Sequence, residues 1–168
     1  PPRSTLFPYT IRFRSGVRAE AAALAQLGAE AAKANESGNG DIAGIAGGVL
    51  EGRAALLERH PAKAAEVFAA AAARQEKAFP VAHNFDPPPW WYPVRRSLAL
   101  ADLRAGKPDD AAREARASLK DWPDDALALR VLSIAETRMG QPRAAREHMA
   151  AARRAWRAQL SSGPDAFQ

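Results

Sequence analysis

Two stretches of the sequence, RAGKPDDAAREARASLKDWP at 104–123 and RMGQPRAAREHMAAARRAWR at 138–157, share a pattern that decides the fold. Residues of one type recur at an offset of 34 (140 − 106), and the pairs are Gly106 and Gly140, Pro108 and Pro142, Ala111 and Ala145, and Trp122 and Trp156. A period of this length, carried by several residue types, is typical of a repeat protein whose units stack on their neighbours. The prediction is an all-α solenoid of stacked antiparallel helix pairs, with Trp122 and Trp156 in equivalent sites.

The composition narrows the class of protein further. The chain has 168 residues, which suits one domain, and its lack of cysteine excludes disulfides and zinc sites built on thiolates. The net charge of +5 favours anionic partners but is too small to indicate nucleic-acid binding. The longest apolar runs, such as VFAAAAA, are far shorter than a membrane span. We therefore expect a soluble protein, cytoplasmic or periplasmic, and the sequence does not distinguish these compartments.

Helix start and stop signals predict the organisation of the chain. Prolines and aromatics at 1–14 indicate an extended lead-in, and residues 15–160 are predicted to form a single helical-repeat domain followed by a flexible tail at 161–168. The expected helices cover 15–34, 41–60, 61–79, 89–105, 108–121, 125–139 and 142–160. Asp41 is the predicted N-cap of the second helix. The four glycines inside the second helix indicate close contact with a neighbouring helix. The proline-rich segment 79–89 is predicted to be a loop insertion.

Two helices in 34 residues resemble the tetratricopeptide repeat (TPR). The two copies begin at Tyr92 and Ala126. Each has a leucine, a turn glycine and small residues at the positions that the family shares, and these are Leu98, Ala99, Gly106, Ala111, Ser118, and Leu132, Ser133, Gly140, Ala145, Ala152. Both copies depart from the family at repeat position 11, where Asp102 and Glu136 replace the usual tyrosine. A fainter copy aligns His60 with Gly106 and places Ala65 at the position of Ala111.

A second resemblance concerns the segment FDPPPWWY at 85–92. It is similar to the Tyr/Phe-Asp-x-Pro-Pro-x-Trp-Tyr segment that leads into the last repeats of a group of large bacterial TPR proteins. The resemblance implies that the chain is the end of a longer repeat array within a larger assembly. It implies no reaction.

The resemblance to TPR proteins also implies where a partner binds. The first helix of each repeat lines a concave face that holds extended peptides, and the corresponding residues here are Arg96, Leu100, Arg104, Arg130, Ile134 and Arg138. Guanidinium groups suit carboxylates through paired hydrogen bonds. We therefore predict a non-enzymatic scaffold that binds a protein or an acidic peptide. The competing interpretation is solvated surface charge, since a basic residue at repeat position 13 is common in the family.

Two alternatives to this function rest on other parts of the sequence. The loop residues His83, Asp86 and Trp90 are candidates for a small-ligand or metal site, against a structural role in which the aromatics fill the gap between displaced repeats. The last helix carries an arginine stripe that suits anionic lipid or nucleic acid, although a terminal helix needs a polar outer face in any case. Because a polar outer face is expected on a terminal helix in any case, we do not expect nucleic acid as a partner. We expect no membrane contact either, except a peripheral one through the last helix. No catalytic or phosphate-binding motif is present, so we expect no enzyme activity, no cofactor and no metal.

Overall fold

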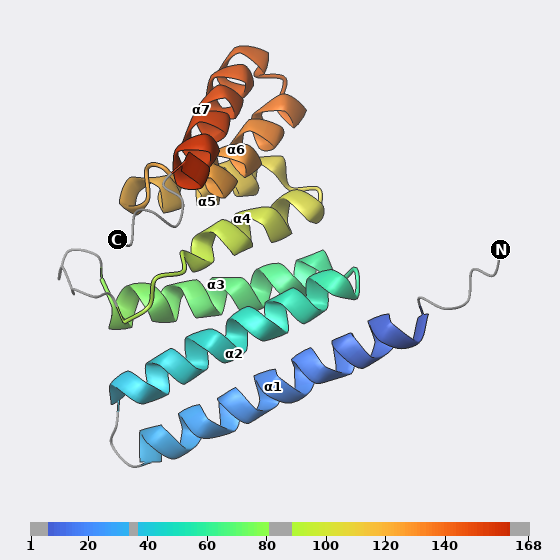
Figure 1. Ribbon diagram of the computed structural model, residues 1–168, viewed down its shortest axis with the longest axis vertical. Coiled ribbons are helices and arrows are strands. Elements are labelled where there is room, and N and C mark those ends of the chain that lie inside the picture. The colour runs from blue at the N-terminus through green and yellow to red at the C-terminus, as the bar shows by residue number, and fades with distance from the viewer. Residues whose placement is uncertain (1–6, 34–36, 81–88, 162–168) are drawn as a thin grey trace. The chain divides into compact units, whose positions relative to one another are not determined.

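The chain is all-α in the residues that the computed structural model describes, which are 7–33, 37–80 and 89–161 (Figure 1). These residues contain no strand and seven helices, and the helices are α1 (Phe7–Lys33), α2 (Ser37–Leu57), α3 (Pro61–Ala78), α4 (Val94–Arg104), α5 (Pro108–Asp121), α6 (Ala126–Arg138) and α7 (Pro142–Ser161). The predicted fold class is confirmed.

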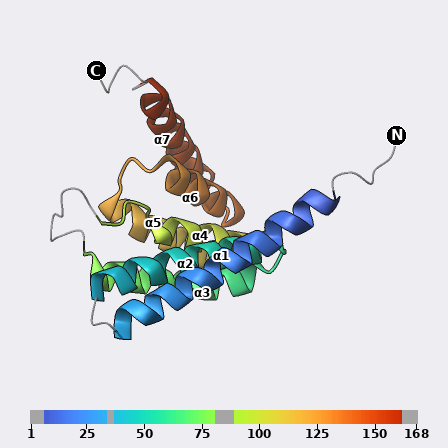
Figure 2. The same cartoon turned by 60° about the horizontal axis from the view of Figure 1, so that its bottom comes forward.

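The chain divides into two compact units, Pro1–Val94 and Arg95–Gln168, where the sequence had predicted one domain over 15–160. The division falls after the proline-rich stretch between α3 and α4, which is also where the 34-residue period is interrupted. Within the N-terminal unit, α1, α2 and α3 lie side by side, and each runs antiparallel to the next (Figures 1 and 2).

Three predicted helix starts were wrong. Helix α1 begins at Phe7 rather than at 15, because a proline such as Pro8 is tolerated in a first turn, where its missing N–H would have no helical partner. Helix α2 begins at Ser37, so Asp41 lies inside the helix and pairs with Arg74, Nε to Oδ1, at 3.3 Å. Helix α4 begins at Val94 instead of 89, since Pro93 disfavours a helical conformation in the residue before it.

Glycines on α2 allow close packing against α3, as the sequence predicted. A Cβ added at Gly52 would lie 2.6 Å from Cε1 of Phe68, whose side chain is fully buried. A Cβ added at Gly48 would lie 2.9 Å from the Cβ of Ala71. The two helices therefore touch through backbone that carries no side chain, with Phe68 seated on Gly52.

The C-terminal unit repeats its turn geometry at an offset of 34. Gly106 and Gly140 both adopt the left-handed conformation, with φ of +79° and +72°. The next N–H donates back to a carbonyl five residues earlier in each copy, from Lys107 to Asp102 at 3.0 Å and from Gln141 to Glu136 at 2.9 Å. Buried residues of three helices pack together, and this core cluster comprises Ala99, Leu103, Ala111, Ala112, Ala115, Val131, Leu132 and Ala135.

The turn between α2 and α3 has the same form, which corrects the predicted alignment of the third copy. Arg59 adopts the left-handed conformation, with φ of 63°, and the His60 N–H donates to the carbonyl of Ala55 at 2.8 Å. Arg59, and not His60, is therefore the equivalent of Gly106, at an offset of 47 (106 − 59). Ala64 rather than Ala65 then corresponds to Ala111. A turn is defined by its left-handed residue, and an arginine there gives no sequence signal.

Candidate functional site

Arg96 is held at the junction between α4 and α6. Its Nη1 donates to Oδ2 of Asp125 at 2.9 Å, and its side chain is 19% exposed. The other carboxylate oxygen of Asp125 accepts the backbone N–H groups of Leu127 and Ala128 at 2.9 and 3.1 Å, which caps the start of α6. One carboxylate thus joins the cap of α6 to an arginine of the preceding repeat.

The remaining five predicted binding residues lie in different environments. Arg138 donates from Nη1 to the carbonyl of Leu103 at 2.6 Å, and this bond joins α6 to α4. Leu100 and Ile134 are partly buried against the core cluster. Arg104 and Arg130 are exposed, and neither forms an ion pair with any described residue. The structure therefore leaves two of the four predicted arginines, one on each first helix, with cationic groups that face solvent.

Repeat position 11 carries a buried carboxylate in both copies. The partners of Glu136 were not predicted from the sequence. Glu136 is 1% exposed, and it accepts a hydrogen bond from Nη2 of Arg116 at 2.9 Å and lies 2.7 Å from Nδ1 of His148. Asp102 occupies the equivalent position one repeat earlier. Burial raises the pKa of the Asp102 carboxyl, and the nearby charges of Asp110 and Glu114 add to the increase. The acidic residue that recurs at repeat position 11 is the sequence signal from which this pairing could have been predicted.

The proline-rich loop is described only in part, since His83 and Asp86 lie outside the described residues. Trp90 is half-buried, and its Nε1 donates to the carbonyl of Tyr92 at 2.8 Å. Trp91 is 71% exposed. Among the described residues, no three side chains of histidine, cysteine, aspartate or glutamate gather in a way that could hold a metal ion.

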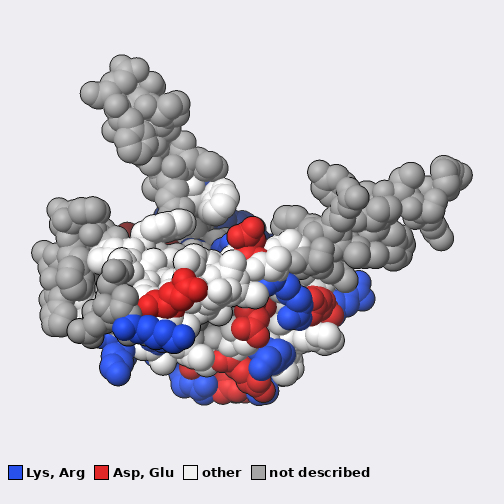
Figure 3. Space-filling view, turned by 90° about the horizontal axis from the view of Figure 1, so that it is seen from below, with Lys and Arg blue, Asp and Glu red and all other residues white. Residues whose placement is uncertain are grey.

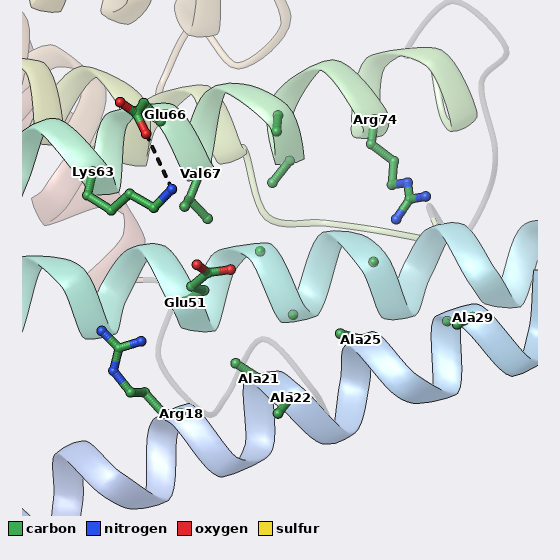
Figure 4. Close-up of a pocket in the computed structure, with 16 residues that line it drawn as sticks. Arg18, Ala21, Ala22, Ala25, Ala29, Glu51, Lys63, Glu66, Val67 and Arg74 are labelled. Carbon is green, nitrogen blue, oxygen red and sulfur yellow. Dashed lines mark hydrogen bonds and ion pairs between the residues drawn. The ribbon is translucent and has the colours of Figure 1, made fainter.

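A hollow of about 810 Å³ lies over α2, between α1 and α3 (Figure 4). Its floor is formed by Gly44, Gly47 and Gly48, and alanines of α1 and α3 line its sides. Most of the charged side chains at its edge are already paired, for example Lys63 with Glu66 at 3.3 Å. The hollow is therefore lined mainly by small residues, and most of the charge at its edge is balanced by a neighbouring side chain.

A second hollow, of about 720 Å³, lies between α6 and α7. Its lining combines exposed apolar side chains with arginines, and the main residues are Leu127, Arg130, Met149, Arg153, Trp156 and Arg157. Trp156 lies within α7 and is 49% exposed, whereas Trp122 is half-buried and ends α5 as its C-cap. The prediction of equivalent environments for the two tryptophans was therefore wrong. The more exposed of the two, Trp156, lines the α6–α7 hollow.

The charge distribution and the helix lengths add two further observations. On the face seen in Figure 3, basic and acidic side chains are interspersed, so neither sign of charge collects there. None of the helices in the described parts of the chain is both long enough and apolar enough to cross a membrane.

The repeated turns and the repeated buried positions make the C-terminal unit a TPR-like helical repeat. No family model matches the chain, and no curated protein matches it. Among solved structures, "MamA MSR-1 C2" is similar at 15% sequence identity with a TM-score of 0.39, over 83% of this chain and 98% of that chain. A likeness at this level carries no argument about function.

Proposed function

We propose that the chain is a non-enzymatic helical-repeat scaffold that binds an acidic segment of a partner protein along the first helices α4 and α6. The observation that carries this proposal is the exposure of Arg104 and Arg130, which lie on consecutive first helices and form no ion pair with any described residue. An exposed guanidinium can bind a carboxylate through two hydrogen bonds without first losing an internal partner. Leu100 and Ile134 add apolar surface that is only partly buried.

Arg96 and Arg138 contribute to this face in a different way. Their hydrogen bonds to Asp125 and to the carbonyl of Leu103 fix α6 against α4, so they set the spacing between the two first helices. They are part of the proposed binding face, but replacing them would change stability as well as binding. The resemblance of the 85–92 segment to large bacterial TPR proteins supports a place for this scaffold in a larger assembly.

The test uses variants that remove charge without removing a structural contact. Arg104→Gln combined with Arg130→Gln removes two cations from the proposed face. Arg146→Gln combined with Arg154→Gln removes the same charge from exposed positions of α7 and serves as the matched control. Protein captured by the wild-type chain from its source cells is identified and then titrated against each variant.

We expect the first variant to weaken binding at least tenfold, since each charge-assisted contact contributes roughly 1.5–3 kcal/mol. High salt should reproduce part of the loss. The control should keep nearly full affinity. Unchanged affinity in the Arg104/Arg130 variant, with an intact helical spectrum, would move the binding face elsewhere. Equal losses in both variants would show attraction by net charge alone.

A further inference from the structure

The α6–α7 hollow is the repeat equivalent of a surface that is already occupied one repeat earlier. An offset of 34 relates Arg130 to Arg96, Met149 to Ala115, Arg153 to Leu119 and Trp156 to Trp122. The earlier set lies on α4 and α5, where Ala115 is fully buried and Leu119 packs against the core cluster that includes residues of α6. Helix α6 therefore covers the surface formed by α4 and α5, whereas the equivalent surface formed by α6 and α7 is open.

The seat of α6 on α4 and α5 shows what such a surface holds. Apolar residues of α6, including Val131 and Ala135, complete the core cluster. The N-cap carboxylate of Asp125 reaches the guanidinium of Arg96 at 2.9 Å. Arg116 adds a second ion pair, to Glu136 at 2.9 Å. The occupant is thus a helix that is apolar on one face and begins with an acid placed beside an arginine.

The open surface has the same elements and more positive charge. Leu127 and Trp156 are 42% and 49% exposed, which is high for large apolar side chains. Among the described residues, Arg130 and Arg153 form no ion pair, and Arg157 donates only to the backbone carbonyl of Arg153, at 3.3 Å. An exposed tryptophan surrounded by arginines has the composition typical of the residues that dominate binding at protein interfaces.

We propose that the α6–α7 hollow receives an amphipathic helix of a partner protein, seated as α6 is seated on α4 and α5. An acidic residue at the N-cap of that helix pairs with Arg130, and its apolar face covers Leu127 and Trp156. Arg153 replaces Leu119 in the open copy, so the helix carries additional acids where it passes that residue. This site lies beyond the first-helix face proposed above; Arg130 is common to both, whereas Arg153 and Trp156 belong to the hollow alone.

The probe for this site is a peptide with the sequence of α6 and its cap, residues 124–139, DDALALRVLSIAETRM. A hydrocarbon staple that replaces the peptide's Arg130 and Thr137, both exposed in α6, keeps it helical, because short isolated helices are marginal in water. Binding to the full chain is followed by fluorescence anisotropy. The same titration uses a second peptide with Asp125→Asn.

We expect Trp156→Ala in the chain, and Asp125→Asn in the peptide, each to weaken binding about tenfold or more. Arg130→Gln in the chain should weaken binding of the wild-type peptide by the same factor. It should cause no further loss of affinity for the Asp125→Asn peptide, because both substitutions remove the same contact. Arg146→Gln, on α7 outside the lining, is the matched control and should leave affinity unchanged.

Three outcomes would overturn the proposal. One is the absence of binding by the stapled peptide to the folded chain. Another is sensitivity to Arg96→Gln instead of Arg130→Gln, since the peptide would then be displacing α6 from its own seat. The third is a monomer–dimer equilibrium that Trp156→Ala abolishes, because the occupant would then be a second copy of the chain. Because Arg130 belongs to both proposed sites, the capture experiment is repeated with Arg104→Gln alone, whose side chain lies outside the lining of the hollow, so that the two proposals fail separately.

Discussion

Replacing Gly52 with alanine tests how closely α2 and α3 pack. The new Cβ would lie 2.6–2.8 Å from three atoms of the Phe68 ring, about 1 Å closer than an ordinary carbon contact. The ring is fully buried, so it has no open space to move into, and the two helices must separate instead. Overpacking of this kind costs about 1–3 kcal/mol, and three simultaneous overlaps place Gly52→Ala at the upper end. The higher helix propensity of alanine offsets about 1 kcal/mol of this loss in the free energy of unfolding. We expect a net loss of about 1–2 kcal/mol in the free energy of unfolding.

The control is the same substitution at Gly16. This residue lies inside α1, is exposed, and has no atom within 4 Å of an added Cβ, so only the gain in propensity applies. Urea unfolding followed by circular dichroism should show Gly16→Ala about 1 kcal/mol more stable than the wild type. The melting temperature of Gly52→Ala should fall by about 2–8 °C. If Gly52→Ala proves as stabilising as Gly16→Ala, the close approach of α2 to α3 is refuted.

Three further predictions concern the turns and the buried acids. Arg59→Gly should raise the free energy of unfolding by about 1 kcal/mol, because glycine adopts the left-handed conformation without strain, and a lower value in urea unfolding would contradict the equivalence of Arg59 with Gly106. Asp125→Ala should cost about 1–2 kcal/mol, whereas Asp125→Asn should cost less because it keeps the N-cap, and equal losses would assign the whole effect to the pair with Arg96. The raised pKa of Asp102 means that the ionised carboxyl lowers the free energy of unfolding, and the loss develops as pH rises from the unfolded pKa of 3.8 through the folded pKa. Asp102→Asn should therefore stabilise the protein more at pH 7 than at pH 4. Urea midpoints that shift equally at both pH values would refute this.

The sequence predicted the C-terminal unit well because its signals are local. Gly106 and Gly140 mark left-handed turns, and Pro108 and Pro142 begin the helices that follow, so turn and helix start are both visible at an offset of 34. The N-terminal unit carries weaker signals. Arg59 takes a turn position without a glycine, and α1 continues back through Pro8 because a first turn tolerates proline. Boundaries that depend on tertiary packing cannot be recognised from such residues.

The candidate sites were predictable only where equal repeat positions have equal neighbours. Arg96 and Arg130 are equivalent in sequence, and the prediction treated them as one pair facing a shared groove. In the structure Arg96 lies against the cap of α6, while Arg130 lines the α6–α7 hollow, because α6 follows the first copy and no described helix follows the second. Trp122 and Trp156 also differ in burial, since Trp122 is half-buried and Trp156 is 49% exposed. A periodic sequence specifies which surface a repeat presents, but what covers that surface depends on the next element. Trp156 and the exposed arginines of the α6–α7 hollow are therefore the residues at which to look for a partner.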